Sequence, residues 1–367
     1  MEVRIFKTKY LITHPLVLIF AAWFAAVVSR LIKNGDVYGL NYNIFQPDGA
    51  LYHAYTLRLQ GYSWFESNRI VNQFFMDRIG VSYLGDTIEP AVQMVIFTRP
   101  LLSLLSIPFV FFFGQVGMLV IPALSFLVIG VVLYLVGKKI NRPYLAVLLF
   151  FILTLSTSAN RWMVANLTDG LLVAIVSIIY LLFVYSRTKI MLSIFIGLAL
   201  LARPSGPLLV AILLPFAYLH RKATIYLGIL LSVIGTLVLA IVSPEAAGAQ
   251  TTGSYTVYQR AQDFALNILQ VLVVEFGQLF VMDRVLFIFI FASTAIAVLA
   301  WKNVYSQSYI LLFCASFAMG AWNGGLGVNF RYQLPLIIAG SLTLLMNFDE
   351  IEIQVRKILR NQKQKNQ

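Results

Sequence analysis

The stretch IMLSIFIGLALLARPSGPLLVAILLPFAYL, residues 190–219, consists of two apolar runs separated by the short segment RPSGP at 203–207. Proline and glycine end helices and favour turns. Basic residues flank the stretch, with Lys189 before it and Arg221-Lys222 after it. Because Lys and Arg gather on the cytoplasmic side of membrane proteins, both flanks are expected to face the cytoplasm. We therefore interpret the stretch as two short membrane crossings joined by a turn on the outer side.

The composition of the whole chain extends this interpretation. Of the 367 residues 60% are hydrophobic and only 11% are charged, and the mean hydropathy is +0.83. Soluble domains of this length do not have such a composition, so the chain is predicted to be a polytopic membrane protein. The single cysteine, Cys314, lies in an apolar run, which excludes a disulfide framework.

The distribution of charge predicts the topology. The start of the chain, the basic clusters near 138–142, 187–189, 221–222 and 302, and the tail together hold 16 Lys and Arg against 4 acids. The remaining segments hold 11 basic residues against 11 acids. The orientation of the chain in a membrane explains this asymmetry, with both termini cytoplasmic. The net charge of +12 therefore gives no reason to expect a nucleic-acid partner.

Two cytoplasmic clusters must be separated by an even number of membrane crossings. Applied to the apolar runs between the clusters, this rule predicts an all-α membrane bundle of about ten spans, with nine to eleven as the range. Residues 1–348 would form one membrane domain, followed by a basic cytoplasmic tail at 349–367. Two large outer loops, 33–115 and 243–283, would carry interfacial helices at 93–113 and 264–282. The predicted spans are 15–32, 116–137, 143–160, 167–186, 190–202, 206–219, 223–242, 284–301, 308–322 and 333–347.

Two acids on the outer side stand where helices are predicted to begin. Asp48 lies in QPDGALYHAYTLRL and is either a helix cap or a carboxylate held at the membrane edge for chemistry. Tyr52, one turn further on, can hydrogen-bond a sugar or the carboxylate, while His53 is either a substrate contact or an ordinary interfacial side chain. Asp169, in ANLTDGLL, is a helix cap or a substrate contact.

Three arginines stand at predicted outer helix boundaries. Arg99 and Arg203 are each followed by proline, and Arg331 lies in the glycine-bearing stretch GGLGVNFRYQLP. Arginine favours bidentate contact with phosphate or carboxylate. The alternative for each is interfacial snorkelling or pairing with Asp48 or Asp169. Three arginines at one membrane level favour an anionic head group there.

Several motifs are absent from the sequence. It contains no GxxxxGK[ST] and no dinucleotide fingerprint, which gives no support for nucleotide binding. It has no HExxH, no CxxC and no Asp-x-Asp pair, so no cofactor and no metal site is expected. No carboxylate lies in the middle of a predicted span, which argues against an ion-coupled transporter.

The order of these pieces resembles a known family. QPDGALYHAYTLRL, FTRPLLSLLSIPF, ANLTDGLL, LARPSGPLL and NFRYQLP follow one another as in the C-type membrane glycosyltransferases (the GT-C fold), especially compact bacterial members without a soluble C-terminal domain. The resemblance implies a sugar donor carried on polyprenyl phosphate. It also implies Asp48 as the catalytic base, and Arg203 and Arg331, with Arg99 behind them, as ligands of the donor phosphate. Many members carry two acids in the first loop where this chain has Asp48-Gly49, so a divalent-metal requirement is not supported.

The expected function is therefore hexosyl or pentosyl transfer to a glycan, lipid or protein acceptor, by a single inverting displacement. Asp169, Tyr52 and His53 are the expected substrate contacts. The expected location is a bacterial inner membrane, with the active face periplasmic or extracellular and membrane lipids around the bundle. The alternatives are a lipid-linked sugar flippase or small-molecule transporter, and a non-enzymatic assembly subunit. A transporter would be expected to show repeat symmetry and polar residues near the midplane, and neither is visible.

Overall fold

The computed structural model of the chain describes residues 14–32, 36–37, 40–41, 45–86, 96–185, 190–203, 205–242, 257–322, 331–349 and 352–353. Within these ranges the fold is helical, apart from β1 (Asp36–Val37) and β2 (Leu40–Asn41), which pair antiparallel. The predicted all-α class is therefore confirmed for the described part of the chain.

Many of the helices follow one another with short connections. They are α2 (Pro15–Ile32), α3 (Pro47–Leu59), α4 (Trp64–Ile79), α6 (Leu101–Phe113), the 3-10 helix η1 (Gly114–Leu119), α7 (Val120–Lys139), α8 (Pro143–Leu155), α9 (Thr157–Val164), α10 (Asp169–Val184), α11 (Ile190–Ala202), α12 (Gly206–His220), α13 (Ala223–Val242), α14 (Val257–Met282), α15 (Arg284–Leu299), α16 (Val304–Trp322) and α17 (Pro335–Met346).

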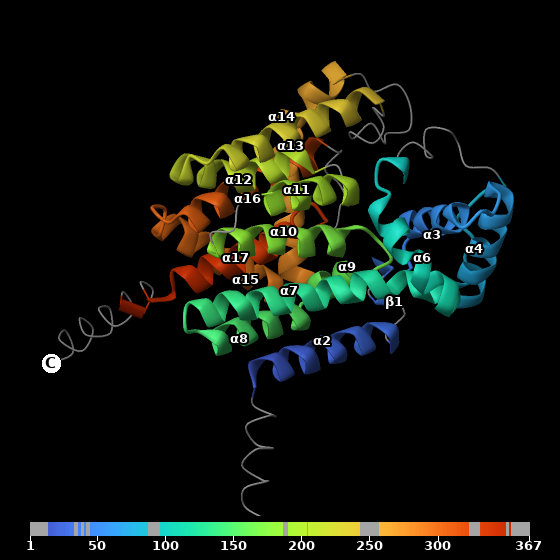
Figure 1. Cartoon of the computed structure of the whole chain (residues 1–367), viewed down its shortest axis with the longest axis horizontal. Helices are drawn as coiled ribbons and strands as arrows, with labels where there is room; N and C mark the ends of the chain where they lie inside the picture. The colour runs from blue at the N-terminus through green and yellow to red at the C-terminus, as the bar shows by residue number, and fades with distance from the viewer. Residues whose placement is uncertain are drawn as a thin grey trace, which may run out of the picture.

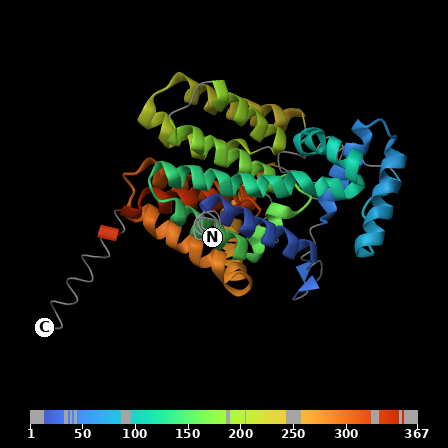
Figure 2. The ribbon, with the colours of Figure 1, turned by 60° about the horizontal axis from the view of Figure 1, so that its bottom comes forward.

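The helices are arranged as a bundle with a smaller group at one end. In Figure 1, α2, α7, α8, α10, α11 and α12 run side by side, while α3, α4 and α6 gather at the right. Figure 2 gives the same division from another direction. Helix α10 packs between α7 and α11, α12 packs against α13 and α16, and α17 packs against α15 and α16. The expected turn between two short helices is present, because α11 ends at Ala202 and α12 begins at Gly206.

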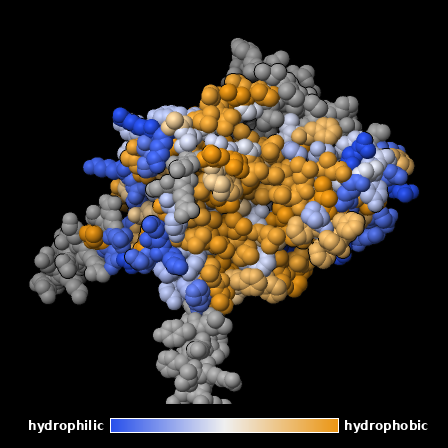
Figure 3. Space-filling model, in the orientation of Figure 1, coloured by the Kyte–Doolittle hydropathy of each residue, from blue (hydrophilic) through white to orange (hydrophobic). Residues whose placement is uncertain are grey.

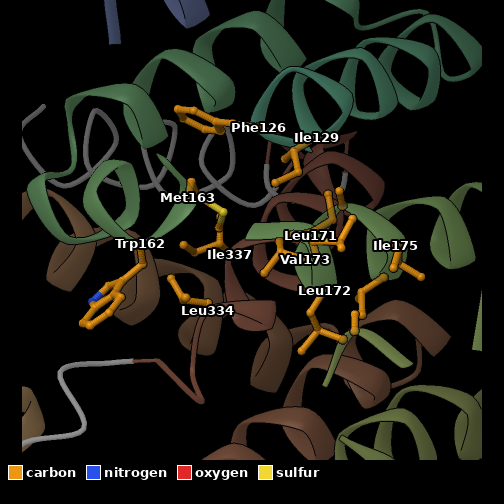
Figure 4. Packing of buried hydrophobic residues seen from close by; sticks show 14 of the residues in the cluster. Phe126, Ile129, Trp162, Met163, Leu171, Leu172, Val173, Ile175, Leu334 and Ile337 are labelled. Atoms are coloured by element: carbon orange, nitrogen blue, oxygen red, sulfur yellow. The ribbon is translucent and has the colours of Figure 1, made fainter. Parts of the chain in front are cut away.

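Helix α10 forms the centre of the core. Its residues are buried along most of its length, and Figure 4 shows Leu171 and Val173 near Phe126 and Ile129 of α7. Lipid is as apolar as these side chains, so van der Waals packing between helices, rather than escape from water, stabilises such a core in a membrane.

The outer surface of the bundle is apolar. Figure 3 shows a broad hydrophobic area over the middle of the molecule, with hydrophilic residues at its two edges. Large apolar side chains are exposed on several helices, among them Phe111 of α6 at 77% and Leu299 of α15 at 80%. Such a surface suits contact with lipid. The described helices therefore have the character of an integral membrane protein.

Helix length supports fewer complete spans than the ten that the charge pattern predicted. Three stretches are long and apolar enough to cross a membrane, namely Pro15–Ile32, Leu101–Lys139 and Val304–Ala321, and a bent pair adds a fourth. Helices of 13 to 16 residues, such as α11 and α10, rise about 20–24 Å, which is less than the hydrocarbon thickness of about 30 Å. The expected ten spans are thus not confirmed.

The third predicted span, 143–160, was wrong in its extent. Helix α8 ends at Leu155, and the chain turns by 85° into α9. The backbone of Ser156 is extended, and its hydroxyl accepts a hydrogen bond from the Ala159 amide, which caps α9. The buried carboxylate of Asp283 accepts from the Ser156 hydroxyl at 2.7 Å and from the Ser158 amide at 2.7 Å. A distant acid therefore stabilises a bend that local hydropathy conceals.

The segment before the second predicted span also differs from expectation. The predicted interfacial helix covered 93–113, of which 93–95 lie outside the described residues; the structure begins α6 only at Leu101, after Pro100. The six residues of η1 then lead directly into α7. Gly114 joins α6 to η1 with a φ of 63°, a conformation that residues with a Cβ rarely adopt.

Three of the segments that are predicted to face the cytoplasm contact one another at one end of the bundle. Arg142, between α7 and α8, forms a 2.7 Å ion pair with Asp349 just after α17. Asn303, beside Lys302, donates a 2.9 Å hydrogen bond to Asn347. These contacts connect three of the basic segments that the charge pattern assigned to one side. The tail beyond residue 353 lies outside the described residues.

Candidate functional site

Asp169 is the centre of a group of charged side chains. It is the first residue of α10, and its side chain is 1% exposed. Arg203, between α11 and α12, pairs with its Oδ1 atom. Arg331, just before α17, donates to Oδ2 from Nη2 at 3.0 Å and from Nε at 3.3 Å. The positive end of the α10 dipole also favours the carboxylate there. Asp169 is therefore bonded by guanidinium groups from two distant parts of the chain.

Arg331 extends this group to α3. Its Nη1 atom donates a 2.9 Å hydrogen bond to Oδ2 of Asp48, which is 283 positions away in the sequence. The Arg331 side chain is 18% exposed and that of Asp48 is 54% exposed, so this side of the group is open to solvent. We refer to Asp48, Asp169, Arg203 and Arg331 as the charge cluster.

Asp48 and Asp169 do not act as helix caps, which was one of the two alternatives for each. The cap of α3 is Gln46, and no side-chain capping bond is made there. The cap of α10 is Thr168, again without a side-chain capping bond. The alternative of pairing between arginines and these acids is confirmed for Arg203 and Arg331. Both acids thus lie in the first turn of a helix but bond to arginines rather than to the backbone.

Aromatic rings cover the two guanidinium groups of the cluster. Arg203 lies over the ring of Tyr332 at 4.6 Å, and Arg331 lies over the ring of Trp162 at 5.1 Å. Arg161 contacts the same indole at 4.7 Å. Cation–π contacts of this kind hold the planes of the guanidinium groups and exclude water from one face. Sequence analysis missed Trp162 and Tyr332, although Tyr332 directly follows one of the predicted arginines.

The electrostatics of Asp48 are dominated by arginine. Partial burial alone would raise the pKa of its carboxyl, but the charge and hydrogen bond of Arg331 and the charges of Arg99 and Arg203 together lower it below the usual value. Asp48 is therefore ionised at neutral pH. While it is paired with Arg331 it is also a weak base, because a proton must compete with the guanidinium group.

Arg99 contributes a further positive charge near the cluster. Its charge acts on both Asp48 and Arg203. The Nε atom of Arg99 is buried and makes no hydrogen bond, and within the described residues Arg99 forms no ion pair with an acid. Three arginines thus face two carboxylates, which leaves an excess of positive charge. Such a site has the charge to bind an anion.

A buried hydrogen-bond network supports Asp48 from behind. Asn166 accepts from the backbone amide of Gln46 at 2.9 Å, and its Nδ2 atom lies 3.2 Å from Nε2 of His53. The other ring nitrogen of His53 lies 3.0 Å from Oε1 of Gln115. A Cβ atom on Gly49 would overlap the amide of Asn166. Glycine follows Asp48 because the helix start approaches this amide closely, which leaves no room for a second acid.

The expected substrate contacts Tyr52 and His53 are buried. His53 has no exposed surface, and burial lowers its pKa to about 3, so it is neutral. Its partners make it part of the support for α3. Tyr52 is 4% exposed, and its carbonyl accepts hydrogen bonds from Thr56 at 2.8 Å and from Ser103 of α6 at 3.1 Å. The structure thus brings Asp48, Asp169, Arg203 and Arg331 into direct contact, with these two side chains behind them.

The arrangement suits anion binding next to a solvent-facing carboxylate. Within the described residues no group of three or more His, Cys, Asp or Glu side chains is placed to hold a metal ion. The two carboxylates of the cluster are bridged by Arg331. Asn166 was the main residue that sequence reasoning missed; it lies three residues before Asp169, and its side chain is buried against His53 and Gln46.

The chain was compared with protein-family models, with curated proteins and with solved structures, and none of the three comparisons found a match.

Proposed function

We propose that the chain is a membrane glycosyltransferase that moves a sugar from a polyprenyl-phosphate donor to an acceptor hydroxyl. The observation that supports this most is the convergence of Asp48, Asp169, Arg203 and Arg331 at one end of an apolar helical bundle. A solvent-facing carboxylate beside several arginines suits a reaction with a phosphate leaving group. The order and the identity of the sequence segments that resemble C-type glycosyltransferases also support this function.

The proposed topology follows the charge pattern. The end that carries Arg142, Lys302 and the tail faces the cytoplasm, and the end that carries the charge cluster faces the periplasm or the cell exterior. The chain crosses a bacterial inner membrane about ten times, with the short helices completing crossings where the bilayer thins around them. In this orientation the donor phosphate, at the lipid head-group level, lies at the depth of Arg99, Arg203 and Arg331.

The reaction is a single displacement at the anomeric carbon. The acceptor oxygen forms a bond to this carbon while the bond from the carbon to the phosphate oxygen breaks. The proton of the acceptor hydroxyl passes to the carboxylate of Asp48. Polyprenyl phosphate leaves with the electron pair, and arginine neutralises the charge that grows on it. One carboxylate is sufficient, and the configuration of the anomeric carbon is inverted.

Arg331 links donor binding to the basicity of Asp48. In the free protein the guanidinium group bonds both acids. A donor phosphate that takes the Nη1 position would separate Arg331 from Asp48 and leave Asp48 able to accept a proton. Asp169 would keep Arg203 and Arg331 in place during this exchange, because its side chain is buried and bonded to both. The acid that binds arginine and the acid that takes the proton are thus different residues.

The experiment that tests the proposal uses the purified full chain in nanodiscs with a panel of polyprenyl-phosphate hexoses and pentoses. At least one donor should raise the unfolding temperature and release polyprenyl phosphate when an acceptor is added. Asp48→Asn should retain the stabilisation and lower transfer by about 10²- to 10⁴-fold. Asp77→Asn, which changes an exposed acid on α4, is the matched control and should transfer normally. Near-normal transfer by Asp48→Asn would refute the role of this residue.

A lipid-linked sugar flippase or small-molecule transporter is the second candidate. The observation that favours it is the Asp48–Arg331 pair, which joins two separate elements at one mouth of the bundle and resembles the ion pairs of transporter gates. In liposomes such a protein would move the lipid-linked sugar between leaflets without changing it chemically. Translocation without transfer would therefore favour this candidate.

A further inference from the structure

Helix α4 carries a cavity on the face that points away from the bundle. Its volume is about 330 Å³, and amide, hydroxyl, charged and apolar side chains line it. The opposite face of α4 packs inward, where Phe74 contacts His53 at 5.8 Å and Phe45 at 5.4 Å between ring centres. The cavity shares no residue with the charge cluster. Figure 1 places α4 at the edge of the molecule, so the cavity is open to the surroundings.

The cavity is built by residues that hold the chain against α4. Gly80, with a φ of 69°, ends the helix and reverses the chain. Asn72 then bonds both backbone groups of Leu84, donating to the carbonyl at 2.6 Å and accepting from the amide at 3.0 Å. At the other end of α4, Ser63 and Glu66 form a capping box. The walls are therefore fixed before any ligand binds, which lowers the entropic cost of binding.

Asn68 leaves an unsatisfied acceptor in the wall of this cavity. Its side chain is 1% exposed, and Nδ2 donates to the Gly85 carbonyl at 2.8 Å. That bond fixes the orientation of the amide, because the opposite orientation would place two oxygens together. Oδ1 is buried and accepts no hydrogen bond. Leaving such a group unpaired is unfavourable, so a movement of the amide that brings Oδ1 to a ligand hydroxyl would be favoured.

The remaining lining combines an aromatic face with both kinds of polar group. Phe65 is 58% exposed and Met76 is 47% exposed, and both border the cavity. Arg69 and Gln73 supply donors, and Asp86 supplies an acceptor. The opposite charges of Arg69 and Asp86 give no net preference for an anion. An acyl chain in the cavity would leave these amide and charged groups without hydrogen-bond partners. Exposed ring surface next to amides and opposite charges suits a ring with C–H faces and several hydroxyl groups.

We propose that this cavity binds one or two uncharged sugar residues of a glycan. A sugar ring stacks on Phe65, Gln73 and Asp86 contact its hydroxyls, and a further hydroxyl donates to Oδ1 of Asn68 once the buried amide turns toward the cavity. The volume lies at the lower end of the range for small-molecule sites, about 300–1,000 Å³. Binding here requires neither transfer nor the charge cluster, so the protein would hold a glycan whether or not it acts on it.

The test measures binding of neutral disaccharides of glucose, galactose, mannose and N-acetylglucosamine to the full chain. Nanodiscs are used because alkyl maltoside detergents would compete for the cavity. Saturation-transfer NMR is expected to detect binding of at least one disaccharide. Phe65→Ala should weaken it by about tenfold, since the stacking contact is lost. Tyr62→Ala, which removes an exposed aromatic outside the cavity, is the matched control and should bind normally.

Three results would overturn the proposal: no binding of any disaccharide, equal binding by Phe65→Ala, or equal loss in Tyr62→Ala. Asp48→Asn separates this inference from the proposed transfer reaction, because it should lower transfer by about 10²- to 10⁴-fold and leave disaccharide binding unchanged. Loss of disaccharide binding in Asp48→Asn would place the saccharide at the charge cluster instead.

Discussion

Replacing Asp169 with asparagine is expected to destabilise the protein more than any other single change in the charge cluster. Asparagine has nearly the same shape, so the change removes the charge and turns one acceptor into a donor that faces a guanidinium group. Asp169 is 1% exposed, and its partners Arg203 and Arg331 are 8% and 18% exposed. Removing one partner of a buried ion pair costs about 3–5 kcal/mol, because the other charge stays buried without compensation.

Asp48 provides the comparison within the same cluster. Among the described residues it pairs only with Arg331, and it is 54% exposed, so Asp48→Asn should cost about 0–1 kcal/mol, the usual range for an exposed pair. The assay is reversible unfolding of the full chain in mixed micelles by increasing the fraction of SDS. The expected order is a large loss for Asp169→Asn and a small one for Asp48→Asn.

A double variant separates the energy of the lost ion pair from the cost of leaving a buried arginine without a counter-charge. Asp169→Leu combined with Arg203→Met removes the buried acid and its more buried arginine together, and Arg331 keeps Asp48. This double variant should regain more than half of the stability that Asp169→Asn loses. If Asp169→Asn costs less than 1 kcal/mol, or the double variant is less stable than the single one, the reasoning from burial is wrong.

Three further predictions concern the surroundings of Asp48. Gly49→Ala should lower stability by about 1–3 kcal/mol, measured in the same unfolding assay, because the added methyl meets a packed amide, whereas Gly197→Ala, with open space around it, should not. Arg331→Gln should raise the pKa of Asp48, so the acid limb of the pH profile of transfer should move to higher pH; an unmoved limb would contradict the pairing. The pKa of His53 is lowered to about 3 in the folded protein, from about 6.5 unfolded. The unfolded chain therefore binds more protons between these values, so stability should fall as the pH falls from about 6.5 towards 3, and His53→Gln should remove that part of the dependence.

The four residues of the charge cluster could be singled out because charges are rare in this sequence. Each of them stands at a helix boundary, and the four meet at one end of the bundle. The pairing itself was not predictable beyond a choice of partners. Whether Arg331 bonds Asp48, Asp169 or both depends on how α3, α10 and α17 approach one another, and hydropathy contains no information on this.

The supporting residues were hidden for a different reason. Asn166 lies against Gly49, and its Nδ2 atom is 3.2 Å from Nε2 of His53. Only the close approach of two segments gives it this role. The end of α8 at Leu155 could not be predicted either, since the sequence from 143 to 160 is apolar and contains no proline after its first residue. The turn at Ser156 depends on a carboxylate more than a hundred positions later.

Asp283 has a consequence for the order in which the chain is assembled during synthesis. Its Oδ2 atom caps the start of α9, while its Oδ1 atom accepts from the Leu286 amide at the start of α15 at 3.0 Å. The ribosome must add 127 residues after Ser156 before this acid exists. Until then the corner between α8 and α9 lacks its carboxylate partner. We therefore expect α8 and α9 to pack loosely at this stage. The final geometry of this corner is therefore set late, when the C-terminal third of the protein leaves the translocon.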